Sequence, residues 1–130
     1  MKFKINNTEW TIEEVDEATI NNEMKDNDTL GATFFRRHEI WLANNNVDMI
    51  RTLKHELMHA WLWEYGHNQH EKEFNSEDIC EIVASSNDFI NEVVDEYKKI
   101  KIEVNGLPNL SARDLERLAK KPTQILNHQG

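Results

Sequence analysis

The segment from Val47 to Gly66 constrains the fold most strongly, because its apolar residues recur at the spacing of a helix. They follow one another at steps of three, four, three and one residues: Ile50, Leu53, Leu57, Ala60 and Trp61. That spacing forms the apolar stripe with which an amphipathic helix packs against a core. Gly66 can take the left-handed conformation that commonly ends a helix. The sequence therefore predicts a helix over about 47–66 with one buried side.

Within this helix the chain reads His55-Glu56-Leu57-Met58-His59, which is the pattern H-E-x-x-H. Two histidines four positions apart stand one turn above the other, so both imidazoles can reach one cation at Zn–N distances of about 2.0–2.1 Å. The histidine face lies roughly opposite the apolar stripe, so it can line a cleft while the stripe is buried. We therefore expect Zn²⁺ bound by His55 and His59, with Glu56 as the catalytic general base.

A catalytic zinc ion takes a third protein ligand and leaves one position for water. One zinc-enzyme pattern places glycine three residues and histidine six residues after the second histidine, but Leu62 and Tyr65 stand there. The other common arrangement takes a carboxylate from a following helix. The third ligand is therefore expected in the next helical segment.

A second helix is expected to begin at Ser76, a good N-terminal capping residue, and to extend to Lys99. Glu77 lies 18 residues after His59, and Glu81 follows one helical turn later. We expect Glu77 to bind the metal and Glu81 to accept a hydrogen bond from the free ring N–H of a ligand histidine, although the two roles can be exchanged.

Hydrolysis also needs a donor for the developing oxyanion. Three side chains at or beyond the end of the first helix are candidates for this role or for substrate contact: Tyr65, His67 and His70. His38 and Tyr97 are further candidates. The sequence does not rank the five residues.

The remaining segments indicate an α+β domain. Residues 2–5 alternate like a strand, 10–18 suit a strand or a short helix, and 31–35 with 39–43 suggest a hairpin. A last short helix is expected to begin at Ser111 and to end before Pro122. The sequence thus predicts one domain over 1–130, with its core at about 30–100 and a C-terminal helical tail over 101–130.

Composition excludes several classes of partner. The chain has 130 residues and a net charge of −9, so it lacks the cationic surface that nucleic acid or an anionic membrane requires. No apolar run is long enough to span a bilayer, and the single cysteine, Cys80, has no internal disulfide partner. Residues 1–11 lack the apolar stretch of a secretory signal. We therefore expect a cytoplasmic protein that binds neither nucleic acid nor membrane.

The H-E-x-x-H segment followed by Glu77 and Glu81 resembles the gluzincin pattern of zinc metallopeptidases. Within that clan, residues of about 30–97 look most like the small ImmA/IrrE-type metallopeptidases and related phage or prophage proteins. The resemblance implies a zincin-like fold, in which a small antiparallel sheet or hairpin packs on an active-site helix and a return helix. It also implies a zinc-dependent endopeptidase that cleaves a protein or peptide, often an intracellular regulatory protein.

Two other interpretations of the sequence remain open. The chain can be a non-catalytic zinc-binding module of the same fold that regulates or binds a partner, with its basic tail as one contact surface. Alternatively, the motif is a coincidence in a structural helical protein. The sequence does not define an oligomeric state.

Overall fold

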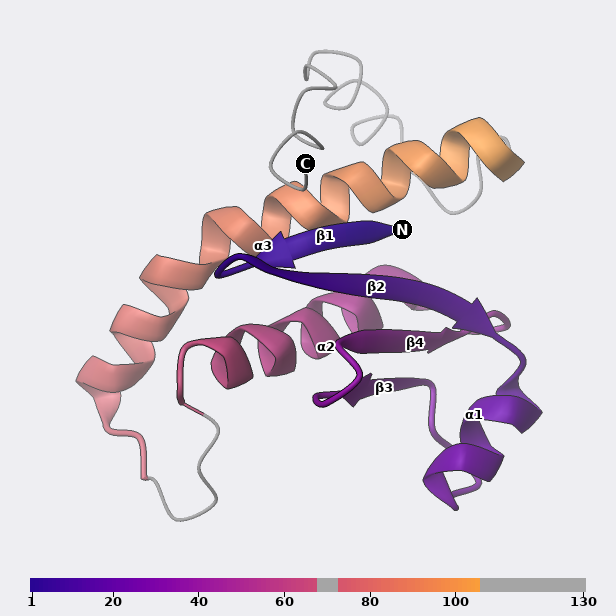
Figure 1. Cartoon of the computed structure of the whole chain (residues 1–130), viewed down its shortest axis with the longest axis horizontal. Helices are drawn as coiled ribbons and strands as arrows, with labels where there is room; N and C mark the ends of the chain where they lie inside the picture. The colour runs from indigo at the N-terminus through magenta and orange to yellow at the C-terminus, as the bar shows by residue number, and fades with distance from the viewer. Residues whose placement is uncertain (68–72, 106–130) are drawn as a thin grey trace.

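In the computed structural model, the described residues, 1–67 and 73–105, form an α+β fold with a four-stranded sheet (Figure 1). The strands and helices are, in chain order, β1 (Lys2–Ile5), β2 (Thr8–Val15), α1 (Glu17–Met24), β3 (Gly31–Phe34), β4 (Glu39–Ala43), α2 (Met49–Glu64) and α3 (Ser76–Asn105). The expected strand at 2–5, the hairpin over 31–43 and the two long helices are confirmed.

The sheet has the order β1-β2-β4-β3 and is mixed. The outer pairs β1–β2 and β3–β4 are antiparallel, whereas β2 and β4 are parallel. The expectation of a small antiparallel sheet is therefore wrong for the central pair. The reason lies in the connection: after β2 the chain passes through α1 to the far edge, so that β4, on its return from β3, runs in the same direction as β2.

Helices α2 and α1 cover opposite faces of the sheet. Successive strand residues point to opposite faces, so Leu42 joins the core beneath α2 while Ala43 packs with Ile20 of α1. The predicted stripe of α2 is confirmed in its buried members, which are Leu53, Leu57, Ala60 and Trp61.

The main core also includes β1, β2 and the second half of α3. Its described members outside α2 and the β3–β4 hairpin are Phe3, Ile5, Trp10, Ile12, Val93, Val94 and Tyr97. Residues 1–15 thus contribute to the core alongside the segment of about 30–100.

Helix α3 begins at Ser76, as expected, and continues to Asn105, six residues beyond the expected end at Lys99. The expected last helix from Ser111, and most of the expected helical tail, lie outside the described residues. None of the described helices has the length and apolar character needed to cross a membrane.

Candidate functional site

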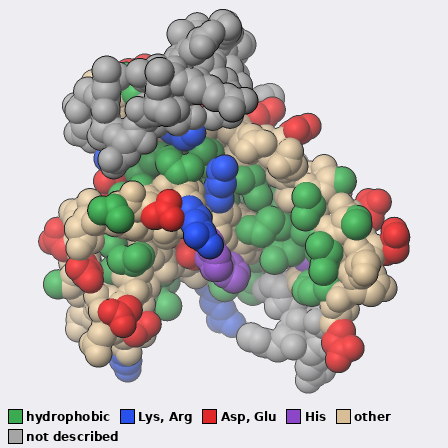
Figure 2. Space-filling model, turned by 180° about the vertical axis from the view of Figure 1, so that it is seen from behind, with side chains coloured by type: hydrophobic (Ala, Val, Ile, Leu, Met, Phe, Trp, Pro, Cys, Tyr) green, Lys and Arg blue, Asp and Glu red, His purple; other side chains and the backbone are tan. Residues whose placement is uncertain are grey.

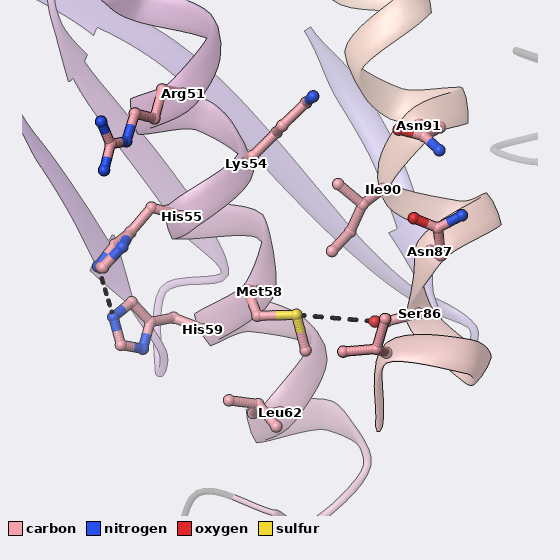
Figure 3. A pocket seen from close by; sticks show the side chains of 11 residues that line it. Arg51, Lys54, His55, Met58, His59, Leu62, Ser86, Asn87, Ile90 and Asn91 are labelled. Atoms are coloured by element: carbon pink, nitrogen blue, oxygen red, sulfur yellow. Dashed lines mark hydrogen bonds between the residues drawn. The ribbon is translucent and has the colours of Figure 1, made fainter. Parts of the chain in front are cut away.

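The two histidines of the motif lie side by side on the exposed surface of α2 (Figure 3). Their Nε2 atoms are 3.2 Å apart, and the ring planes meet at 75° with centroids 4.8 Å apart. Two nitrogen ligands of one tetrahedral zinc ion, each about 2.0–2.1 Å from it, are roughly 3.3 Å apart. The spacing of His55 and His59 therefore fits two ligands of a single ion.

Glu56 is held beneath this pair, with 7% of its surface exposed. The Thr33 hydroxyl, on β3, donates a hydrogen bond of 2.8 Å to Glu56 Oε1, and it lies 3.2 Å from the main-chain oxygen of the same residue. A carboxylate fixed in this way has few orientations left, which suits a group that must accept a proton from one direction.

Gly31 allows strand β3 to approach Glu56 closely. A Cβ atom at this position would lie 3.1 Å from Glu56 Oε2 and 2.6 Å from Thr52 Cγ2. The glycine therefore leaves room beside the carboxylate. A cavity of about 380 Å³ opens there, and its lining includes Gly31, Thr52, His55 and Glu56. A cavity of that size has room for several water molecules.

A second cleft of about 490 Å³ lies on the other side of the histidines, between α2 and α3. His55, His59 and Met58 line it from α2, and Ser86 and Ile90 line it from α3 (Figure 3). The Ser86 hydroxyl donates to Ile82 O at 2.7 Å and lies 3.7 Å from Met58 Sδ, which joins the two helices across the cleft. The histidine pair thus stands between two open spaces.

The expected third ligand is not next to the histidine pair in the described residues. In residues 1–67 and 73–105, no three His, Cys, Asp or Glu side chains gather so that they could hold a metal. Glu77 and Glu81 are exposed on the first turns of α3. At 100° per residue, Glu81 lies roughly 160° around the helix from Val83, which lines the cleft. The roles of Glu77 and Glu81 therefore stay predictions.

The candidate oxyanion donors lie at different places. Tyr65 and His67 both pack on Trp61, with ring centroids 4.8 Å and 5.8 Å from it. Neither is among the described residues that line the two spaces beside the histidines. His70 lies outside the described residues. The substrate contacts expected of these three side chains stay predictions.

Tyr97 and His38 serve other parts of the fold. Burial, and a hydrogen bond of 2.6 Å donated to Glu14, raise the pKa of Tyr97 far above its ordinary value. Burial raises the pKa of Glu14, but hydrogen bonds from Lys101 and Tyr97 outweigh this effect and hold it below the ordinary value. The ring of His38 packs against Trp10, with centroids 5.2 Å apart.

Sequence reasoning missed the residues that support the motif from outside α2. Thr33 and Gly31 reach Glu56 across 23 and 25 residues of sequence. Phe35 lies edge-on to His59 at 6.5 Å and stacks on Trp63 at 4.8 Å. No local sequence pattern predicts such contacts, although a glycine within a strand can indicate that another part of the chain approaches closely.

Comparison with protein-family models, curated proteins and solved structures found no match for this chain.

Proposed function

We propose that the chain is a zinc-dependent endopeptidase with a zincin-like fold. The observation that carries the proposal is the joint placement of the motif: two histidine Nε2 atoms lie 3.2 Å apart beside a buried glutamate that Thr33 holds by a hydrogen bond of 2.8 Å. The common face of the two rings follows from their spacing on a helix, but a chance occurrence of the motif does not require a hydrogen-bond partner for the buried glutamate. The resemblance of the motif to the gluzincin pattern adds support.

Each side chain has a defined role in this proposal. When bound, Zn²⁺ supplies a Lewis acid that polarises a peptide carbonyl and lowers the pKa of a water molecule. His55, His59 and Glu77 would hold the ion, and Glu81 would accept a hydrogen bond from the free ring N–H of a ligand histidine. Glu56 takes a proton from the attacking water and returns it to the leaving amine nitrogen, which balances the hydrolysis.

The open edge of β3 offers a place for a peptide substrate. The carbonyl of Leu30 accepts a hydrogen bond from Ala43 N at 2.9 Å. Because antiparallel partners alternate, the main-chain groups of Gly31 and Thr33 then point away from β4. An extended peptide can pair with these groups by strand addition. Its backbone would then run past the buried glutamate.

The predicted setting belongs to the proposal as well. An intracellular regulatory protein of a bacterium or phage is the substrate that the resemblance suggests, and the cytoplasm is the compartment. No membrane or nucleic acid is needed for this activity.

The activity is tested with the Glu56→Gln variant. The amide oxygen of glutamine can still accept the hydrogen bond from Thr33, so the fold and zinc content are expected to stay unchanged. Glu64→Gln is the matched control, because it carries the same change on α2 at a residue that accepts a bond of 2.8 Å from Trp10 Nε1. Mass spectrometry of a complex peptide library incubated with each zinc-loaded protein detects new termini. Wild type and Glu64→Gln are expected to cleave, and Glu56→Gln to lose at least about 100-fold in rate.

A second candidate function follows from the lack of a third ligand among the described residues. In this alternative the chain binds zinc and regulates or binds a partner without catalysis. Zinc binding together with identical, absent cleavage by wild type and Glu56→Gln would favour it over the peptidase.

A further inference from the structure

The cleft between α2 and α3 has an unusual charge for this chain. The protein contains 24 acidic and 15 basic residues, yet none of the described residues lining the cleft is Asp or Glu. Arg51 and Lys54 lie at one end of it, next to His55. In Figure 2, side chains in the colour of lysine and arginine lie directly beside histidine. The cleft is therefore a local cationic site.

The two cations are available to a ligand. Within the part of the chain that the structure describes, neither Arg51 nor Lys54 forms a hydrogen bond or an ion pair. Arg37 and Lys101, by contrast, are paired with glutamates on the surface. Asp48 lines the adjoining cavity together with Arg51 but forms no ion pair with it.

The other residues that line the cleft are mainly apolar, and two of them carry amide side chains. Met58 and Leu62 on α2 face Val83 and Ile90 on α3, and Val83 is 55% exposed. Asn87 and Asn91 add donors and acceptors that can bind a peptide main chain. The volume of about 490 Å³ lies within the range of roughly 300–1,000 Å³ typical of ligand sites. These features suit a ligand with apolar side chains and a negative charge.

We infer that this cleft binds an extended segment of the substrate in which an acidic residue adjoins an apolar one. The carboxylate pairs with Arg51 and Lys54, and the apolar side chain packs between Met58 and Val83. The inference rests on the proposed function, because the acidic residue then lies beside His55 and within a few residues of the cleaved bond. It names acidic-apolar peptides as the substrate class.

Binding is measured apart from catalysis, with the zinc-loaded Glu56→Gln variant. Fluorescein-labelled octapeptides serve as probes in matched pairs, one with Leu-Glu or Ile-Asp at its centre and one with Leu-Gln or Ile-Asn. Fluorescence anisotropy is expected to show at least about tenfold tighter binding of the carboxylate peptides at low salt, and a smaller difference at high salt. Equal affinity within every pair would overturn the inference.

Charge substitutions locate the site. Arg51→Gln/Lys54→Gln is expected to abolish the preference for carboxylate peptides, while Arg51→Glu/Lys54→Glu is expected to reverse it toward lysine-containing peptides. Lys2→Gln/Lys25→Asn is the control: it removes two charges elsewhere, and asparagine tolerates the left-handed backbone of Lys25, whose φ is 54°. A control that removes the preference as fully as the cleft variant would contradict the assignment.

Two further outcomes separate this inference from the proposed function. Acidic peptides that bind through Arg51 and Lys54 but that wild type leaves uncut would support the binding site and refute the peptidase. Efficient cleavage with no preference for an acidic residue near the cut would support the peptidase and overturn the inference. Equal binding of a labelled octathymidylate would also overturn it, because phosphate would then serve as well as a carboxylate.

Discussion

Gly31→Ala tests whether β3 and α2 are packed as tightly around Glu56 as the structure shows. The new methyl group would lie 2.6 Å from Thr52 Cγ2 and 3.1 Å from both Glu56 Cγ and Oε2. A carbon pair at 2.6 Å is well inside the contact distance of about 3.5–4.0 Å, and the β-branched threonine cannot turn its methyl group away without changing rotamer. Overpacking of this kind costs about 1–3 kcal/mol. Replacing glycine by alanine within a strand stabilises the fold by roughly 0.5–1 kcal/mol. We therefore expect the free energy of unfolding to fall by about 1–2 kcal/mol in total.

Thr52→Ser provides the matched second substitution. Serine lacks the Cγ2 atom but keeps the hydroxyl that accepts a bond of 2.6 Å from Asn46 Nδ2. In a double-mutant cycle, Gly31→Ala is expected to cost at least about 1 kcal/mol less in the Thr52→Ser background. Urea unfolding followed by tryptophan fluorescence measures all four proteins. If Gly31→Ala is as stable as wild type, or if Thr52→Ser does not reduce its cost, β3 and α2 are not packed as tightly around Glu56 as the structure shows.

Three further predictions concern the core and the site. Tyr97→Phe removes the bond to Glu14 and is expected to cost about 1–2 kcal/mol at pH 7 in urea unfolding. Because the folded pKa of Glu14 lies below its ordinary value, its contribution is present above about pH 4–5 and is lost as the pH falls through the folded pKa, so the cost should shrink in acid. A cost that stays constant over the whole acid range in which the protein is folded would exclude this origin. Thr33→Val is expected to lower kcat about tenfold with KM and zinc affinity unchanged, and Thr33→Ser to restore it; unchanged kcat would show that the bond to Glu56 is not needed. Glu77→Gln is expected to weaken zinc binding at least about tenfold more than Asp78→Asn in competition with a chelator, and equal effects would reject Glu77 as a ligand.

The helices that carry the motif could be predicted because their signals are local. The apolar stripe of α2 is visible in the spacing of Leu53, Leu57 and Trp61, and each of the three is buried. Ser76 marked the start of α3. The β3–β4 hairpin followed from apolar, β-prone residues on both sides of a polar turn.

Sheet topology depended on contacts between distant segments. The parallel pairing of β2 with β4 joins Ile12 to Ile40, and neither strand shows its partner in its own residues. Helix α1 was missed because it is short and polar, with Ile20 as its one buried residue. Asn6 and Asn7, with φ of 48° and 67°, were an overlooked signal for the tight β1–β2 turn, since asparagine is favoured in such conformations.

In the candidate site, too, features within one helix could be predicted from the sequence, whereas contacts between elements could not. The common face of His55 and His59 follows from helix geometry alone, and the structure places the two rings together. The support of Glu56 by Thr33 depends on how β3 lies against α2, which no helical spacing specifies. The third ligand is still harder to predict, because its prediction requires the position of α3 relative to α2 and the direction of an exposed side chain.

Anomalous diffraction at the zinc absorption edge, from crystals of the full chain grown with Zn²⁺, shows whether His55 and His59 bind one zinc ion together. We expect one peak about 2.0–2.1 Å from Nε2 of both His55 and His59, with a carboxylate oxygen of Glu77 also bound. A zinc-loaded crystal in which the ion lies elsewhere, with the two imidazoles unbound, would contradict it.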